Sequence, residues 1–250
     1  MSNPITGAGY FLRGLKLITQ PGLRRFVAIP LAINLLLFAG LIWFGASQFG
    51  SLLDSFMPEL PGWLQWAEWL FWLLFGVSAL LILFFAFSLL ANIVAAPFNG
   101  LLAEAVEVHL TGEQLEGDAG WKKMIAELVP TFIDELRKLL YLLACTIPFL
   151  ILFLIPGINI IAPFAWFAFM AWMLVLEYID YPMGNHGLRG DEQKLCLRKK
   201  RLMSLGFGGT VTLATMTPVL NFLVMPAAVA GATAMWVEQF QGQTGELIED

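Results

Sequence analysis

The sequence predicts an all-α integral membrane protein with two full transmembrane helices, two re-entrant (half-penetrating) helical hairpins and an N-terminal amphipathic helix. Its 250 residues are 58% hydrophobic and only 13% charged, whereas a soluble domain carries about 25% charged residues. All 14 Lys and Arg residues fall into three clusters, at 13–25, 122–138 and 189–201. Four runs contain no charged residue, and each exceeds the roughly 20 residues that cross hydrocarbon: 26–53, 69–103, 139–176 and 202–237. No linker divides the chain, so residues 1–250 are expected to form a single membrane domain.

Residues 5–20 come before the first charge-free run and predict a modest amphipathic helix. Arg13 and Lys16 are three residues apart, which places them on one side of such a helix. A helix of this kind lies in the membrane interface with its apolar face toward the acyl chains. We therefore expect residues 5–20 to rest on the membrane surface.

The runs 26–53 and 69–103 are each predicted to cross the membrane once. The segment between them is acidic and rich in tryptophan, a composition typical of a membrane–water interface. Two crossings return the chain to the side on which it started. There, residues 104–138 carry Lys and Arg again, and we expect them to form a charged cytoplasmic helical hairpin.

The runs 139–176 and 202–237 are expected to be re-entrant hairpins. A single crossing for each run would place the basic 189–201 loop on the acidic side, against the positive-inside tendency. Two crossings for each run would leave arms of roughly 15 residues, about 22 Å of helix against a hydrocarbon core of about 30 Å. A hairpin that turns near its middle and leaves on the side it entered satisfies both limits.

The turns of the two predicted hairpins resemble each other. Both contain Pro, two residues, Asn, and then a second Pro three or four residues later: Pro156, Asn159 and Pro163 in one, and Pro218, Asn221 and Pro226 in the other. A repeat of broken membrane helices can mark a transport site. A loop turned by proline and capped by asparagine explains the same residues, so both interpretations stay open.

Residues 20–25 (Gln-Pro-Gly-Leu-Arg-Arg) are the sharpest candidate for a binding site. They lie where the predicted surface helix ends and the first crossing begins. The first turn of a helix offers unpaired N–H groups, Gly22 allows close approach to the backbone, and Arg24 and Arg25 add forked cationic donors. This combination predicts an anion site. Two arginines at a membrane boundary can equally be topology signals or bind lipid phosphate.

A second set of candidates consists of polar residues within or beside the crossings. Buried amides in membrane helices commonly join one helix to another, and they can also line a polar path. Glutamates would repel an anion, which favours a gate or an ion-pair network over a direct ligand. The pore or gate candidates are Asn34, Asn92, Asn99, Glu104 and Glu107.

The segment Glu177–His186 holds two acids, an asparagine and a histidine at a membrane exit. It has no metal-ligand spacing, so we expect a structural turn there and no metal or other cofactor. Motifs for a P-loop, a zinc hydrolase or a nucleophile elbow are missing from the sequence. We therefore expect neither an enzyme nor a nucleic-acid-binding protein.

Four motifs, in this order along the chain, resemble the CysZ sulfate permeases of bacterial inner membranes. They are Gly14–Phe26 (GLKLITQPGLRRF), Ala95–Glu104 (AAPFNGLLAE), Glu177–Pro182 (EYIDYP) with Asn185-His186, and Gly231–Val237 (GATAMWV). The resemblance covers about residues 10–240. The segment 113–120 and the tail 241–250 match no pattern of the family.

This resemblance implies a multi-pass inner-membrane protein that takes up sulfate for cysteine biosynthesis. It implies sulfate binding at Gly22, Leu23, Arg24 and Arg25, and a homo-oligomer, expected to be a hexamer. It also implies two long membrane helices with two pairs of half-penetrating helices, in agreement with the charge pattern. Two other functions remain alternatives: a non-transporting membrane scaffold or assembly factor, and an enzyme acting on lipid phosphates.

Overall fold

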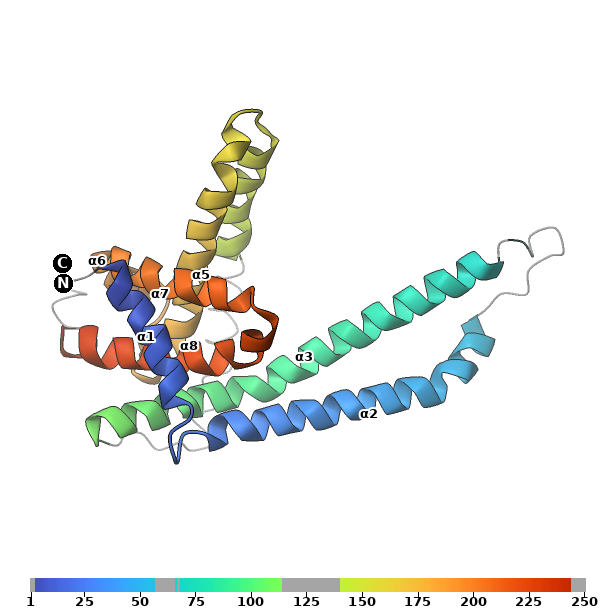
Figure 1. The fold of residues 1–250 in the computed structure, drawn as a ribbon, viewed down its shortest axis with the longest axis horizontal. Helices are drawn as coiled ribbons and strands as arrows, with labels where there is room; N and C mark the ends of the chain where they lie inside the picture. Colours follow the sequence, from blue (N-terminus) through green and yellow to red (C-terminus); the bar gives the residue numbers. More distant parts are fainter. Residues whose placement is uncertain (1–2, 57–65, 67, 114–139, 244–250) are drawn as a thin grey trace. The chain divides into compact units, whose positions relative to one another are not determined.

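The protein is helical throughout the part of the chain that the computed structural model describes, which comprises residues 3–56, 66, 68–113 and 140–243. This confirms the all-α prediction. Residues 114–138 of the expected cytoplasmic hairpin lie outside the described ranges, and α3 continues through residues 104–111. The elements are α1 (Pro4–Leu17), α2 (Arg25–Phe56), α3 (Glu68–Thr111), a helix over Leu140–Leu154, η2 (Ile158–Ile160), α5 (Ala162–Asn185), α6 (Asp191–Lys199), α7 (Arg201–Thr215), α8 (Pro218–Gln239) and η3 (Gln241–Gln243) (Figure 1).

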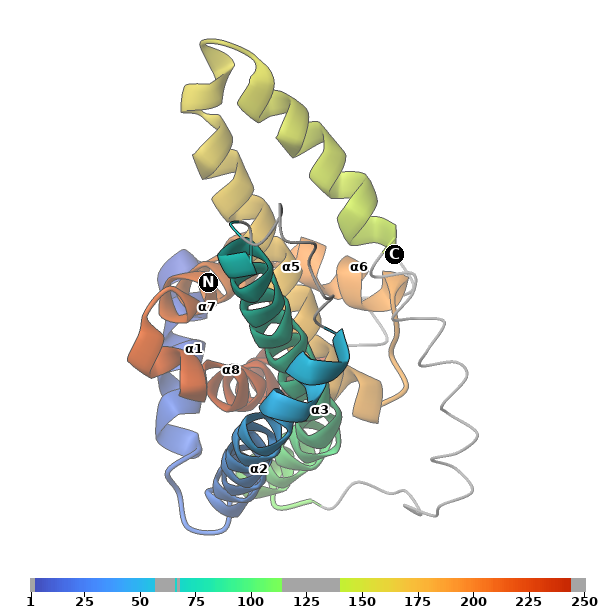
Figure 2. The same ribbon diagram turned by 90° about the vertical axis from the view of Figure 1, so that its right-hand side faces the viewer.

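The chain divides into two compact units, residues 25–98 and residues 1–24 with 99–250. In the unit 25–98, α2 and the first part of α3 run side by side (Figures 1 and 2). The rings of Phe38 and Phe87 meet edge to face between them, with centroids 4.9 Å apart. Large apolar side chains on both helices are exposed, among them Leu36 and Trp43 at more than 70%. Exposed apolar surfaces of this extent are typical of contact with lipid or with another protein.

The core of the other unit is built by α1, α5, α7 and α8. Helix α1 begins where it does because the Asn3 side chain accepts a hydrogen bond from the Thr6 N–H at 2.8 Å and Pro4 occupies the first turn. The face of α1 that was expected to lie on the membrane is buried against α7 and α8. It carries Gly7, Tyr10, Phe11, Gly14 and Leu17.

Glycines allow α1 to approach its neighbours at backbone distance. A Cβ on Gly7 would collide with the Met203 carbonyl of α7, and a Cβ on Gly14 would collide with the Ala227 carbonyl of α8. At the outer end of the contact, Glu238 of α8 forms an ion pair with Arg13 and accepts a hydrogen bond from the Tyr10 hydroxyl at 3.0 Å. Close glycine packing of this kind is the usual means by which membrane helices associate.

Each of the runs 139–176 and 202–237 folds into two helices joined by a turn. The helix Leu140–Leu154 and α5 lie side by side (Figures 1 and 2), and Phe149 of the first stacks on Phe169 of the second at 4.8 Å between centroids. Their turn contains Gly157 at φ 85°, a left-handed conformation that only glycine adopts without strain. Helices α7 and α8 are joined through Met216 and Thr217.

The two turns are not structurally equivalent, although their sequences resemble each other. Pro156 lies in the first turn, whereas Pro218 is the first residue of α8 and Pro226 lies inside that helix. The interpretation that asparagine caps these turns is wrong, because neither the N-cap of α5 nor that of α8 receives a side-chain hydrogen bond. Asn221 instead lies within the first turn of α8, where its N–H donates to the Thr217 carbonyl.

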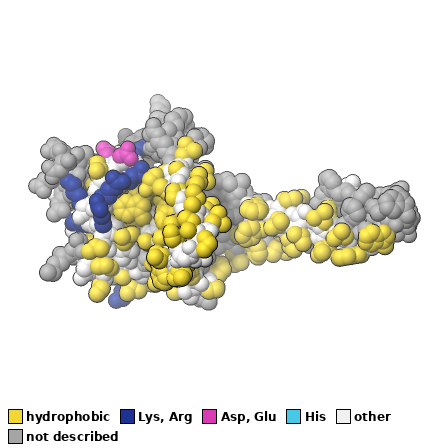
Figure 3. Space-filling model, turned by 90° about the horizontal axis from the view of Figure 1, so that it is seen from above, with side chains coloured by type: hydrophobic (Ala, Val, Ile, Leu, Met, Phe, Trp, Pro, Cys, Tyr) yellow, Lys and Arg dark blue, Asp and Glu magenta, His cyan; other side chains and the backbone are white. Residues whose placement is uncertain are grey.

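Three described helices are long and apolar enough to cross a membrane: Arg25–Gly45 of α2, Ala162–Asn185 of α5 and Leu220–Gln239 of α8. The arms that precede the last two are shorter, with α7 containing 15 residues. Hydrophobic side chains form large parts of the visible surface of the protein (Figure 3). These features establish a helical protein that is suited to a membrane.

Candidate functional site

The loop between α1 and α2 contains the residues predicted to bind an anion. It is a compact turn, in which the Gln20 carbonyl accepts hydrogen bonds from the Leu23 and Arg24 N–H groups at 3.2 and 3.1 Å. Pro21, expected at the start of the first crossing, lies within this loop, and α2 begins only at Arg25. The N–H groups of Leu23 and Arg24 are thus already engaged, which leaves the Gly22 N–H and the two guanidinium groups as donors for an anion.

Gly22 and Leu23 fix the shape of this loop. Gly22 has φ 92°, in the left-handed region, and a Cβ added there would meet no atom within 4 Å. Its conformation, and not its surroundings, therefore requires glycine. Leu23 is 3% exposed and anchors the loop in the core of its unit. The sequence pattern alone does not distinguish this anchoring role from a contact with the anion.

Arg24 and Arg25 directly follow Leu23 in the sequence, and both are exposed. The Arg25 guanidinium lies 4.8 Å from the centroid of the Phe26 ring, a cation–π contact that restrains its position. Within the described ranges, no carboxylate forms an ion pair with either arginine. Their forked donors are therefore available for a tetrahedral oxyanion.

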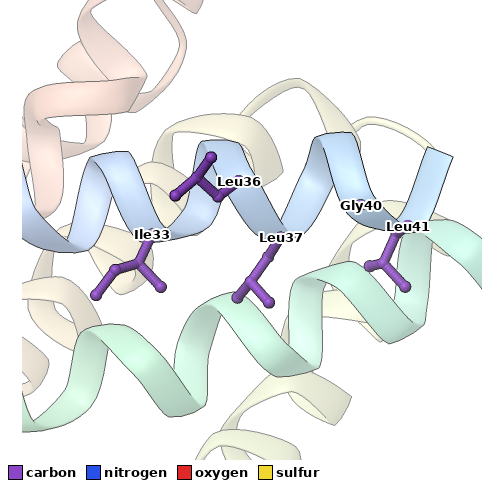
Figure 4. A pocket seen from close by; sticks show the side chains of 5 residues that line it. All are labelled: Ile33, Leu36, Leu37, Gly40 and Leu41. Atoms are coloured by element: carbon purple, nitrogen blue, oxygen red, sulfur yellow. The ribbon is translucent and has the colours of Figure 1, made fainter. Parts of the chain in front are cut away.

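A shallow groove on α2 has the opposite chemistry. It is lined by Ile33, Leu36, Leu37, Gly40 and Leu41, all without polar side-chain atoms (Figure 4). A dianion placed there would lose its hydration and gain no hydrogen bond, which is prohibitively unfavourable. This groove suits an acyl chain or another helix and is excluded as an anion site.

The predicted pore residue Asn99 meets the end of α5 inside one unit. Asn99 of α3 is 5% exposed, and its side-chain amide donates to the Tyr181 hydroxyl at 3.3 Å. Asn185 reaches back from α5 to the Gly100 carbonyl at 3.5 Å. These bonds join segments that lie more than 80 residues apart in the sequence, and they hold the end of α5 beside α3.

Glu107 is the centre of a buried polar group in this region. It is 2% exposed, and its Oε1 accepts hydrogen bonds from His186 Nε2 at 2.7 Å and from Gln241 Nε2 at 2.9 Å. The His186 ring packs on Trp236 of α8, with centroids 5.3 Å apart. We call Glu107, His186, Trp236 and Gln241 the Glu107 cluster. It ties α3, α5, α8 and η3 together.

Two buried polar atoms of the Glu107 cluster have no hydrogen-bond partner among the described residues: Glu107 Oε2, an acceptor, and Trp236 Nε1, a donor. Buried polar groups are normally satisfied by protein or by ordered water. One acceptor and one donor left over in the same cluster are complementary to bound water. The cluster therefore has spare hydrogen-bonding capacity, as a polar path requires.

The other predicted pore residues are placed differently. Glu104 is exposed, although it is only three residues before Glu107 on the same helix. Asn34 belongs to α2 in the other unit, and its Oδ1 is buried without a partner in the described part of the chain. Asn92 lies within α3, and its side chain is outside the described set. Of the candidates whose side chains the structure describes, Asn99 and Glu107 contact the end of α5.

The segment Glu177–His186 was expected to form a turn, and this expectation is wrong. It is the end of α5, which continues through Pro182 to Asn185. Sequence reasoning therefore missed the roles of Tyr181 and His186 as partners of α3. The i, i+4 spacing of Tyr181 and Asn185 places them on one helix face, which was the available signal. Within the described residues, no three His, Cys, Asp or Glu side chains are grouped to hold a metal ion.

Removal of the histidine partner should destabilise the Glu107 cluster. We expect His186→Ala to lower the free energy of unfolding by about 2 kcal/mol, because it leaves a buried carboxylate with fewer donors. The measurement is an SDS titration of the purified protein in mixed micelles. Glu107→Gln in the His186→Ala background should restore part of the loss, because an amide tolerates the site better than an unpaired carboxylate.

Glu104→Gln is the matched control, since Glu104 is exposed on the same helix. It should change the free energy of unfolding by less than about 0.5 kcal/mol. Equal effects of His186→Ala and Glu104→Gln would show that the contact between His186 and Glu107 contributes nothing to stability.

A family model matches the loop and, of the Glu107 cluster, Glu107 and His186. Residues 10–226 match the family model described as "Sulfate transporter CysZ/Etoposide-induced protein 2.4". A protein named "Sulfate transporter CysZ" from Pseudomonas fluorescens (strain Pf0-1) is 48% identical over 235 residues, which are 94% of each chain. Proteins of the same name from Pseudomonas syringae pv. tomato and Pseudomonas aeruginosa (strain LESB58) are 47% and 46% identical over 94% of this chain, and over 93% and 96% of their own lengths.

Proposed function

Because the chain belongs to the sulfate transporter CysZ/etoposide-induced protein 2.4 family, we propose that it conducts sulfate across the bacterial inner membrane and so supplies cysteine biosynthesis. Proteins named as sulfate transporters match nearly the whole chain. The observation that carries the proposal is the exposed pair Arg24 and Arg25, which follows the glycine turn and stands at the entry of the candidate span Arg25–Gly45.

Sulfate is a dianion at physiological pH and cannot enter hydrocarbon without replacement of its hydration shell. Arg24, Arg25 and the Gly22 N–H would supply charge-assisted hydrogen bonds to its oxygens. Polar side chains would then line the path, with Asn99 and the Glu107 cluster as the candidates that the fold brings together. The exposed position of both arginines favours weak binding, so that sulfate can also leave.

The membrane arrangement that we propose has α2 and α3 as crossings and the pairs Leu140–Leu154 with α5 and α7 with α8 as re-entrant hairpins. The 15-residue α7 supports this, because 15 residues span about 22 Å, less than the hydrocarbon core of about 30 Å. The arms α5 and α8 contain 24 and 22 residues, more than the roughly 15 expected from the sequence, so the proposal rests on the short first arm of each pair. Helices that end within a membrane need protein around their turns. A homo-oligomer, proposed to be a hexamer, would bury the exposed apolar surfaces of several copies.

Sulfate flux into liposomes tests the proposed function. Vesicles that contain the purified protein and sulfate-free buffer should take up radiolabelled sulfate much faster than protein-free vesicles do. An excess of external chloride should not reduce this uptake. Vesicles that contain folded protein but admit no sulfate would contradict transport. If a partner protein also co-purified with the chain, the scaffold alternative would be favoured.

Gly22→Ala tests the loop geometry. A non-glycine residue at φ 92° is strained by about 1 kcal/mol, and the loop would relax by moving Arg24 and Arg25. We expect sulfate binding, measured by calorimetry, to weaken roughly fivefold, which is the change in affinity that corresponds to about 1 kcal/mol. Gly9→Ala is the control, because Gly9 lies in α1 with open space around its Cβ position; it should bind sulfate as the wild type does.

A further inference from the structure

The end of α6 and the start of α7 carry a surface that sulfate transport does not use. Arg198, Lys199 and Arg201 lie within four consecutive residues, and all three are exposed; we call them the α6–α7 basic patch. Arg201 Nε donates to the Arg198 carbonyl at 3.2 Å, which holds the two arginines close together. Figure 3 shows Lys and Arg side chains on one face of the protein, with hydrophobic and acidic side chains beside them.

The patch is directed away from the protein interior. The intervening Lys200 points the other way, since its ammonium donates to the Gln239 carbonyl and burial lowers its pKa. The acidic residues of α6 are at its opposite end, where Asp191 pairs with Lys194 at 3.1 Å and Glu192 accepts from the Arg189 N–H. Within the described ranges, no carboxylate forms an ion pair with Arg198 or Arg201.

In the proposed membrane arrangement, the contact of α6 with the start of the helix Leu140–Leu154 would place the patch near a membrane interface. The Lys194 ammonium lies 4.7 Å from the centroid of the Tyr141 ring, at the beginning of that helix. Leu143, Ile147 and Leu154 of the same helix are more than 50% exposed. Such a surface suits lipid tails, which would place the end of the helix that carries Tyr141 near the headgroups, where Tyr is enriched.

Apolar side chains flank the basic patch as well. Leu195, three residues before Arg198, is 42% exposed, and Leu202, directly after Arg201, is 57% exposed. Cations beside exposed leucines are complementary to a phosphate group attached to acyl chains, whereas a free anion has no use for the leucines. Guanidinium groups are the side chains best matched to phosphate oxygens.

We propose that the α6–α7 basic patch binds the phosphate of anionic phospholipids, with Leu195 and Leu202 against the upper acyl chain. Arg198 and Arg201 supply the forked donors, and Lys199 adds charge. This site is separate from the loop that contains Arg24, and it does not depend on sulfate transport. Its consequence is a preference of the protein for anionic over zwitterionic lipid.

Lipid binding to the purified full-length chain tests the proposal. Detergent-solubilised protein is titrated with phosphatidylglycerol and, separately, with phosphatidylcholine, each carrying a fluorophore on an acyl chain. The wild type should prefer phosphatidylglycerol, and Arg198→Gln with Arg201→Gln should weaken that binding roughly 30-fold. This factor corresponds to about 1 kcal/mol for each cation near an anionic lipid surface.

Two further variants make the result specific. Arg198→Lys with Arg201→Lys keeps the charge and should retain most of the preference. Lys16→Gln, which removes an exposed cation from α1, should retain all of it. Equal binding of the two lipids by the wild type, or an unchanged preference in the double Gln variant, would overturn the proposal. Binding of inorganic phosphate to the patch, measured by calorimetry, without any lipid preference would also overturn it.

Discussion

Replacement of Arg24 and Arg25 together by alanine is expected to reduce sulfate flux into proteoliposomes at least 100-fold. Each guanidinium offers a hydrogen bond to a charged acceptor, worth about 1.5–3 kcal/mol, and the sum of about 3 kcal/mol or more corresponds to two decades in binding. Calorimetry should show the same loss of sulfate affinity. Arg24→Lys with Arg25→Lys should recover part of it, because the charge remains while the fork is lost.

The charge-matched control is Arg198→Ala with Arg201→Ala, which also removes two exposed arginines. In vesicles of zwitterionic lipid this variant should conduct sulfate at the wild-type rate. If the Arg24 and Arg25 double variant conducts within threefold of the wild type, these residues do not form the sulfate site. If it conducts normally but loses a co-purified phospholipid, the arginines bind lipid phosphate instead.

The positions of the described helices were predictable because charge is a local property of the chain. The uncharged run 26–53 became α2 at Arg25–Phe56, and the turn at Gly157 falls near the middle of the run 139–176. A residue that cannot enter hydrocarbon limits where a membrane helix can end. The ends of these helices can therefore be predicted from the nearby sequence alone, without knowledge of contacts to distant parts of the chain.

The contacts of α1 and Glu107 were not predictable in the same way. An apolar helix face is the same whether it packs on lipid or on protein, so the burial of Tyr10 and Gly14 could not be read from the amphipathic pattern of residues 5–20. The bond between Glu107 and His186 joins residues 79 positions apart. Only the packing of α3 against α5 brings them together, and no spacing within one helix encodes it.

The loop between α1 and α2 lies between these two cases. Its arginines are exposed and its Gly22 has a positive φ, while anion binding at this loop stays a prediction. The sequence pattern did not predict that the Leu23 and Arg24 N–H groups donate hydrogen bonds to the Gln20 carbonyl. A helix start was expected at Pro21, but α2 begins at Arg25, after a turn that contains the buried Leu23.

Gly14→Ala is expected to destabilise the protein by about 3 kcal/mol, the upper part of the range for overpacking. A Cβ there would collide with the Ala227 carbonyl and come within 2.7 Å of the Gly231 nitrogen. These are backbone atoms of α8, so no side-chain rotation can relieve the contact, and α1 must move away as a whole. The measurement is again the free energy of unfolding by SDS titration.

Gly9→Ala makes this a test of packing and not of helix propensity. Both glycines lie within α1, but a Cβ on Gly9 would meet nothing within 4 Å. Alanine favours a helix over glycine by about 1 kcal/mol, so Gly9→Ala should stabilise the protein slightly while Gly14→Ala destabilises it. The opposite signs follow only if α1 packs against α8 through its glycine face. Two stabilising substitutions would mean that α1 lies on the membrane surface, as its sequence alone suggests.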